Sequence, residues 1–175
     1  VRADLCELCV MKPPLSPQTD LPELIEGLHD STIIAIATDH APHTIEEKHK
    51  ALASGKKVYG VPGIQEMLPL MLTHLPEQGF NLSAISRLLS TNPASRFHIK
   101  ERGKIVAGYH ADLTFVDTNR QYQIGDANHP IQSRCGWSAY QDWPVKGEIV
   151  ATMVNGRFAF VNQAYSQKLH STQVQ

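Results

Sequence analysis

The sequence has few cysteines, no long hydrophobic run and no excess of charge of either sign. Three cysteines among 175 residues are too few, and odd in number, for a disulfide framework, which indicates a reducing, cytoplasmic setting. The longest apolar run, residues 33–37, is far shorter than the ~20 residues of a membrane-spanning helix. The 16 basic and 17 acidic residues create no field that would attract nucleic acid or an anionic membrane. We therefore expect a small-molecule partner, no nucleic acid and no membrane.

Motifs of several common functional classes are also missing. The sequence contains neither a glycine-rich phosphate loop nor a G-x-S-x-G nucleophile motif. Cys6 and Cys9 form a C-x-x-C pair, but a zinc site would need a second pair of ligands, so we interpret residues 5–10 as a short packed strand. The chain starts at Val1 without a charged-then-apolar leader, and we expect a piece of a longer protein that is not exported.

Strand-like and helical segments alternate at the start of the chain. Three prolines make residues 11–17 a loop, and apolar spacing then predicts a helix at residues 21–28. Residues 32–38 contain an uninterrupted apolar run, which is typical of a strand buried on both faces of a parallel sheet. The order of strand, loop, helix and strand indicates parallel α/β units.

Further elements follow from composition and capping residues. Residues 44–60 are polar and end in glycines, so we expect a mobile active-site loop there. A wide apolar face predicts a helix at residues 64–75. Ser83 is expected to cap a helix at residues 84–89, and Asn92 to cap the short turn after it.

The composition changes at Gly103, after which glycine and proline separate β-rich segments. Asn155-Gly156 is a strong signal for a hairpin turn. The predicted strands cover residues 111–116, 148–155 and 157–162, and a polar tail follows.

Asp39 directly follows the expected buried strand. In α/β barrels, the residues just beyond the carboxyl ends of the strands line the active site. A carboxylate in that position can bind a divalent metal ion and take a proton from metal-bound water. Alternatively, Asp39 caps the loop by bonding to its own backbone, and the spacing leaves both interpretations open.

Other candidate site residues lie near Asp39 or in neighbouring loops. His40 and His43 place two imidazoles beside the carboxylate, which predicts a polar pocket for a metal ion or an anionic substrate. Residues 61–63 precede a helix and would offer backbone donors to an anionic or amide group, unless they form an ordinary junction. Lys12 is a partner for a substrate carboxylate or is simply solvated.

Several motifs in combination resemble those of the dihydroorotases, which are cyclic amidohydrolases. The most specific is residues 36–43, followed by Glu46-Glu47-Lys48. The resemblance extends over nearly the whole chain through Asn92-Pro93-Ala94, Arg102-Gly103-Lys104-Ile105, Gly108-Tyr109-His110-Ala111-Asp112-Leu113, Cys135-Gly136-Trp137-Ser138 and Val154-Asn155-Gly156.

The resemblance implies an α/β fold, namely the C-terminal part of a metal-dependent (β/α)8 TIM barrel with strands of a small β-sandwich subdomain. Residues 1–100 would form the last βα units of the barrel, residues 101–163 the subdomain with its connecting segment, and residues 164–175 a polar tail. The implied reaction is the reversible conversion between dihydroorotate and N-carbamoyl-L-aspartate in de novo pyrimidine biosynthesis.

The resemblance also implies roles for individual residues. Asp39 would bind a metal of a binuclear zinc centre and carry the proton to the leaving amide nitrogen. His43 would contact the substrate carboxylate, and the backbone at Pro62 and Gly63 would hold the ring. The family's H-x-H pair, carboxylated lysine and further metal-binding histidines precede the matched region, so we expect the isolated chain to be inactive. Lys12 and Ser16 replace an asparagine and a basic residue that the family often has near these prolines.

Two alternatives to a dihydroorotase remain open. The first is a non-catalytic, dihydroorotase-like scaffold that binds aspartate transcarbamoylase, and the second is a hydantoinase or allantoinase. The presence of Asp39 and His43 favours an enzyme. Because a partial barrel leaves strand edges and apolar faces uncovered, we also expect a homo-oligomer.

Overall fold

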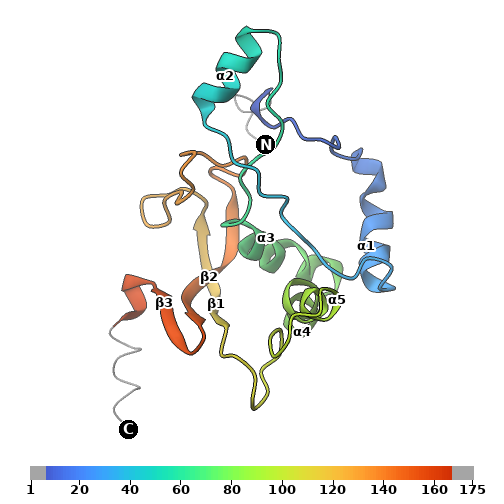
Figure 1. Ribbon diagram of the computed structural model, residues 1–175, viewed down its shortest axis with the longest axis vertical. Helices are drawn as coiled ribbons and strands as arrows, with labels where there is room; N and C mark the ends of the chain where they lie inside the picture. The colour runs from blue at the N-terminus through green and yellow to red at the C-terminus, as the bar shows by residue number, and fades with distance from the viewer. Residues whose placement is uncertain (1–6, 167–175) are drawn as a thin grey trace.

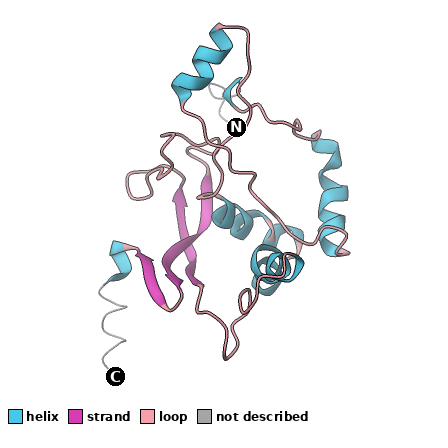
Figure 2. Cartoon of the chain, viewed as in Figure 1, coloured by secondary structure: helices cyan, strands magenta, loops and turns pink. Residues whose placement is uncertain are grey.

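The computed structural model describes residues 7–166, in which helices occupy the first part and a sheet the second (Figure 1). Long loops separate these elements (Figure 2). The α-helices are α1 (Leu21–His29), α2 (Ile45–Ala53), α3 (Met67–His74), α4 (Leu82–Ser86) and α5 (Asn92–Arg96). The shorter helical segments are η2 (Gln18–Asp20), η3 (Pro76–Gln78) and η5 (Gln163–Tyr165), which are 3₁₀ turns, and η4 (Arg87–Thr91), which is a π-helical turn.

The sheet has the antiparallel order β1 (Leu113–Gln123), β2 (Pro144–Val154), β3 (Arg157–Val161). The predicted hairpin is confirmed, because Asn155 and Gly156 connect β2 to β3 with φ angles of 49° and 77°. Two positive φ angles are what a tight hairpin turn between twisted strands requires. All three expected strands are present, and β1 and β2 are longer than predicted. The parallel sheet expected from the first part is not found within residues 7–166.

Residues 32–38 run as a loop, so the prediction of a buried strand is wrong (Figure 2). Ile34 is 39% exposed. The Ile36 N–H donates to the Leu88 carbonyl (3.3 Å), and the Asn92 side-chain amide donates to the Ile34 carbonyl (2.8 Å). A strand requires a hydrogen-bonded neighbour, and no strand among the described residues pairs with this segment. The segment is therefore held by helical neighbours instead of a ladder.

The expected strand at residues 5–10 is also absent from the part that the structure describes. Glu7 and Leu8 form a 3₁₀ turn, and Cys9 and Val10 have no regular structure. Leu8 is buried and Cys9 packs beside it, so this segment contributes to the core as predicted but without strand geometry. Cys6 lies outside the described residues.

Residues 44–60 contain α2, so the prediction of a loop throughout this segment is wrong. Thr44 and Glu47 form a capping box: the Glu47 N–H donates to the Thr44 hydroxyl oxygen (3.1 Å) and the Thr44 N–H to the Glu47 carboxylate (2.8 Å). A threonine followed three residues later by glutamate is a local signal for a helix start. The sequence therefore contained the information that identifies α2.

The predicted helices at residues 21–28 and 64–75 are confirmed as α1 and the shorter α3. The cap of α4 is Asn81 and not Ser83, because the Asn81 side-chain oxygen accepts the Ala84 N–H (2.9 Å). Asn92 was expected to be a cap, but it is the first residue of α5 and its side chain binds the loop at residue 34.

Helix α3 lies between the sheet and the pair α4 and α5 (Figure 1). Gly147 of β2 allows this close approach, because a Cβ atom there would lie 2.6 Å from Leu72 Cδ1. The core is divided among three clusters of buried side chains. These are Leu72, Leu75, Phe80, Ile85 and Leu88; Leu70, Ile124 and Val145; and Leu8, Val61, Cys135, Trp137 and Ala139. The cluster that contains Trp137 lies next to the candidate site.

Candidate active site

Asp39 is exposed and has a left-handed backbone conformation, with φ 45°. Such a conformation is uncommon for a non-glycine residue and is often found at functional sites. The Thr38 hydroxyl, not Asp39, accepts the His40 N–H (3.2 Å) and closes the turn. Among the described residues, no side chain or backbone group bonds to the Asp39 carboxylate. The capping interpretation is therefore wrong.

Three segments that are far apart in the sequence meet around Asp39. The Ala41 N–H donates to the Val61 carbonyl (3.1 Å), and the Gly60 N–H donates to the Val10 carbonyl (2.9 Å). The first bond joins the loop that follows Asp39 to the loop before α3. The second bond joins the loop before α3 to the first described residues. The predicted substrate contacts at Pro62 and Gly63 are thereby placed beside the Asp39 turn.

The His40 ring binds the loop before α3. The N–H groups of Gly63 and Ile64 both donate to His40 Nδ1, at 3.0 Å and 3.2 Å. The prediction that this loop offers free backbone donors is therefore wrong for Gly63. Pro62 carries no N–H, and the Gly63 carbonyl accepts the Met67 N–H (3.1 Å), so a ligand would meet the Pro62 carbonyl here instead of a donor.

His43 is partly buried, and its Nδ1 lies 3.8 Å from the Glu47 carboxylate. The Trp137 indole N–H donates to the His43 carbonyl (2.7 Å) and fixes the backbone at this position. The Thr44 backbone bond lowers the pKa of Glu47, and the nearby His43 ring lowers it further. Glu47 therefore carries a negative charge next to the histidine that was predicted to contact a substrate carboxylate.

Trp137 bonds to His43, and Lys48 lies against Trp137, which the sequence did not predict. The Lys48 side chain is 2% exposed, and its Nζ donates to the Val58 carbonyl (2.9 Å). The same Nζ lies 5.7 Å from the centre of the Trp137 ring, within the range of a cation–π contact. Burial lowers the pKa of Lys48. The two residues attach α2 to the loop at residues 133–140.

Lys12 is exposed, and its Nζ lies 6.0 Å above the Tyr59 ring. Because Tyr59 precedes Gly60, this positive charge is close to the loop that carries Pro62 and Gly63.

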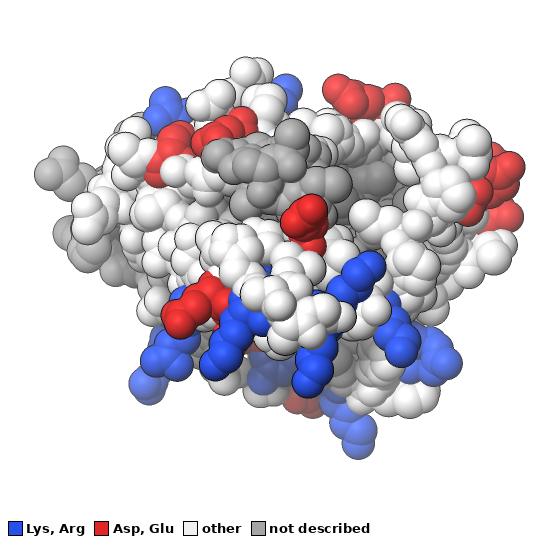
Figure 3. Space-filling model, turned by 90° about the horizontal axis from the view of Figure 1, so that it is seen from above, with Lys and Arg blue, Asp and Glu red and all other residues white. Residues whose placement is uncertain are grey.

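Lys and Arg side chains gather along one edge of the face that is viewed from above, and Asp and Glu side chains lie mainly elsewhere (Figure 3). The nearly neutral chain therefore has local regions of charge.

We expect Gly60→Ala to separate the loops around the site. Gly60 has φ 107°, and a Cβ atom there would lie 2.5 Å from Ala41 Cβ and 2.7 Å from the Ala41 carbonyl oxygen. The substitution should lower the free energy of unfolding by about 1–3 kcal/mol, measured by urea denaturation. Gly55→Ala is the matched control, because Gly55 also has a positive φ, of 69°, but no atom lies within 4 Å of its Cβ position. Equal losses in both variants would contradict the steric explanation.

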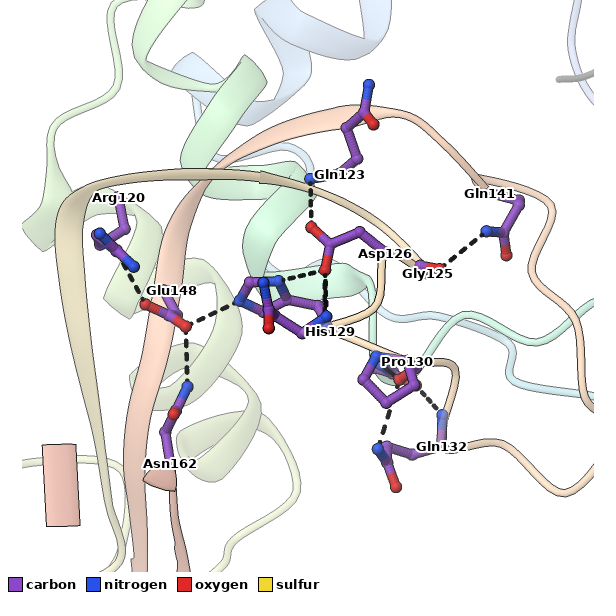
Figure 4. Close-up of polar contacts among 12 residues, drawn as sticks. Arg120, Gln123, Gly125, Asp126, His129, Pro130, Gln132, Gln141, Glu148 and Asn162 are labelled. Atoms are coloured by element: carbon purple, nitrogen blue, oxygen red, sulfur yellow. Dashed lines mark hydrogen bonds and ion pairs between the residues drawn. The ribbon is translucent and has the colours of Figure 1, made fainter. Parts of the chain in front are cut away.

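A second group of polar side chains comes from β2 and from the loop between β1 and β2 (Figure 4). The His129 ring bridges Asp126 (2.9 Å) and Glu148 (2.8 Å), and it stacks on Tyr122 with ring centres 3.9 Å apart. A cavity of about 760 Å³ borders this group and is also lined by Glu66, a buried residue whose two carboxylate oxygens have no hydrogen-bond partner among the residues that the structure describes. The residues around Asp39 do not line this cavity, so the cavity is separate from the predicted site.

Glu148 is expected to make the stability of the sheet depend on pH. Burial raises the pKa of this carboxyl, but hydrogen bonds from His129, Tyr165 and Asn162 outweigh burial, so its pKa lies below the usual 4.5. The stabilisation is therefore present above pH 4.5 and is lost as the pH falls through the folded-state value. In Glu148→Gln, the urea midpoint should fall less steeply with acidification than in the unmodified chain, whereas the exposed Glu23→Gln should leave the slope unchanged.

Between Glu7 and Ser166, no cluster of three or more His, Cys, Asp or Glu side chains is placed to bind a metal ion. In the same part of the chain, none of the helices has the length and hydrophobicity that crossing a bilayer requires.

Comparison with known proteins agrees with the motifs found in the sequence. The model of the Amidohydrolase family matches residues 2–159. The dihydroorotases of Lactiplantibacillus plantarum and Halalkalibacterium halodurans are each 37% identical to this chain, over 151 and 155 residues and 86% of its length. These matches cover 34% of each relative, so the chain spans about a third of the length of these dihydroorotases.

Solved structures agree on the fold. The L-hydantoinase (dihydropyrimidinase) from Arthrobacter aurescens matches with a TM-score of 0.77 at 24% identity, over 93% of this chain and 37% of that protein. The dihydropyrimidinase from Brevibacillus agri matches with a TM-score of 0.81 at 19% identity, over 93% and 36%. At these identities the likeness concerns the fold alone. Since the family model covers nearly the whole sequence, this chain belongs to the amidohydrolase family.

Proposed function

We propose that this chain provides the Asp39-bearing part of a dihydroorotase, which interconverts dihydroorotate and N-carbamoyl-L-aspartate. The observation that carries the proposal is the Asp39 carboxylate, which is exposed, has no bonding partner among the described residues and lies in a turn fixed on both sides. The dihydroorotases that are 37% identical to the chain support this choice of substrate. In this proposal, residues 1–100 belong to the last units of a TIM barrel.

The Asp39 carboxylate fits the role of a metal ligand, because an unbonded oxygen donor suits a divalent cation. Zinc would need further donors from outside the described residues, since no cluster of three ligands lies within them. When bound, zinc would lower the pKa of an attacking water and polarise the amide carbonyl. We assign only one of its ligands, Asp39, to this chain.

The residues of the chain have separate tasks in the reaction. Asp39 accepts a proton from the attacking water and delivers it to the amide nitrogen that leaves as the ring opens. The His43 ring donates a hydrogen bond to the substrate carboxylate, and the Trp137 indole holds the His43 backbone in place. The Pro62 carbonyl accepts a hydrogen bond from an N–H group of the ring, because the Gly63 N–H is bonded to His40 and the Gly63 carbonyl already accepts the Met67 N–H (3.1 Å).

A chimera tests this function. In it, the chain replaces the corresponding third of the Lactiplantibacillus plantarum dihydroorotase, and the turnover of dihydroorotate, hydantoin and allantoin is compared. We expect turnover of dihydroorotate well above that of the other two substrates, and none from the chain alone. Preference for hydantoin or allantoin would support the alternative chemistry. A folded, zinc-loaded chimera without any turnover would instead favour a scaffold, whose proposed partner is aspartate transcarbamoylase.

The proposal includes a cytoplasmic enzyme that forms a homo-oligomer. Several large apolar side chains are exposed along the chain, among them Ile105 (88%), Phe97 (71%) and Phe160 (49%). Exposed apolar surface of this kind favours association. The mass of the chimera in solution, measured by light scattering, tests the oligomer directly.

A further inference from the structure

We propose that His40 is a positioning residue whose neutral ring, protonated only on Nε2, holds the Pro62–Ile64 backbone against the Asp39 turn. The effect of His40 on catalysis rests on the function proposed above. The arrangement of the ring and the loop can be tested without any turnover.

The geometry determines which ring nitrogen carries the proton. Two backbone N–H groups, from Gly63 and Ile64, point at His40 Nδ1. A backbone N–H can only donate, so Nδ1 must present its lone pair, and the single proton of a neutral imidazole then lies on Nε2. A protonated Nε2 has no lone pair for a metal ion. His40 therefore holds the loop and is not a metal ligand, although the sequence left both roles open.

The position of His40 links two parts of the candidate site. Its backbone N–H closes the turn on Thr38, while its ring binds the residues after Pro62. Between these anchors Asp39 has φ 45°, a strained conformation for a non-glycine residue that persists only where neighbouring contacts impose it. Ala41, which follows His40 in the chain, donates a further hydrogen bond to the Val61 carbonyl. The ring thus fixes the distance between the Asp39 carboxylate and the Pro62 backbone that would meet the substrate.

The first test uses the chain as it is. Long-range ¹H–¹⁵N correlation spectra distinguish a protonated from an unprotonated imidazole nitrogen, and we expect the His40 signals of the Nε2-protonated form. The amides of Gly63 and Ile64 should exchange slowly with solvent. A His40 ring protonated on Nδ1, or rapid exchange of both amides, would overturn the proposal.

The second test uses substitutions that copy one ring nitrogen at a time. The oxygen of an asparagine side chain can occupy the position of Nδ1, whereas glutamine reaches the position of Nε2. We expect H40L and H40Q to accelerate amide exchange at Gly63 and Ile64 roughly tenfold, as loss of a hydrogen bond predicts, and H40N to retain protection. The control is H49L, which removes an exposed histidine on α2. Equal exchange in H40N and H40L would refute the role of Nδ1.

The same variants in the chimera connect the loop to catalysis. H40L should lower kcat with unchanged zinc content, and H40N should restore much of it. If zinc content instead falls in both variants, His40 is a ligand and the proposal fails. If the unmodified chimera has no turnover, the proposed function fails, while the spectra and exchange rates still decide the role of His40.

Discussion

Asp39→Ala is expected to reduce the dihydroorotate turnover of the chimera by about 10²–10⁴-fold, the usual contribution of a general acid–base residue. The loss follows from removing the carboxylate that carries the proton between water and the amide nitrogen. Asp39→Asn should be similarly impaired, because an amide keeps the shape of the side chain but cannot accept that proton. The measurement is kcat at saturating dihydroorotate, together with zinc content.

The control for Asp39 is Asp20→Ala, which removes an exposed carboxylate in η2, outside the candidate site. Its turnover should match that of the unmodified chimera. If Asp39→Ala kept turnover within tenfold of the unmodified chimera, the proton would be carried by another group. In that case Asp39 would have only a structural role.

Trp137→Ala is expected to have the largest effect on stability. Trp137 is 4% exposed, packs in the cluster with Leu8 and Val61, and donates its indole N–H to the His43 carbonyl. Loss of such a buried aromatic side chain costs about 3–5 kcal/mol. The free energy of unfolding from urea denaturation of the chain measures this loss.

Trp137→Phe separates packing from hydrogen bonding. Phenylalanine retains most of the apolar contact but cannot donate to His43, so we expect a loss of about 1–2 kcal/mol, from the missing bond and the smaller ring. The exposed Phe97→Ala is the control and should change stability by less than about 0.5 kcal/mol. If Trp137→Ala were no more destabilising than Phe97→Ala, the cluster next to the site would not be part of the stable core.

Local sequence patterns correctly identified several elements. The Asn155-Gly156 hairpin, helices α1 and α3, and the β-rich second part depend on turn residues and on apolar spacing among neighbours in the chain. The capping box at Thr44 is equally local, but the polar composition of residues 44–60 predicts a loop in its place, and the structure has α2 there. These features need no knowledge of distant residues.

Predictions that required a distant partner were less successful. The apolar run before Asp39 has the composition of a buried strand, but whether it forms one depends on neighbouring strands, and none lies beside it among residues 7–166. The backbone donors at Gly63 appeared free because the residue that binds them, His40, lies 23 positions earlier. Composition describes what a segment favours, whereas its partners decide the outcome.

By itself, the sequence determined the family motifs, the β-hairpin, the main helices and the position of Asp39 after an apolar run. Only the tertiary structure decided that the Asp39 carboxylate has no bonding partner within residues 7–166, that His40 holds the loop before α3 and that Trp137 binds His43 from 94 residues away. The physical reason is the range of the interactions. Turns, caps and apolar faces involve residues a few positions apart, whereas the hydrogen bonds that assemble the site join segments that only folding brings together.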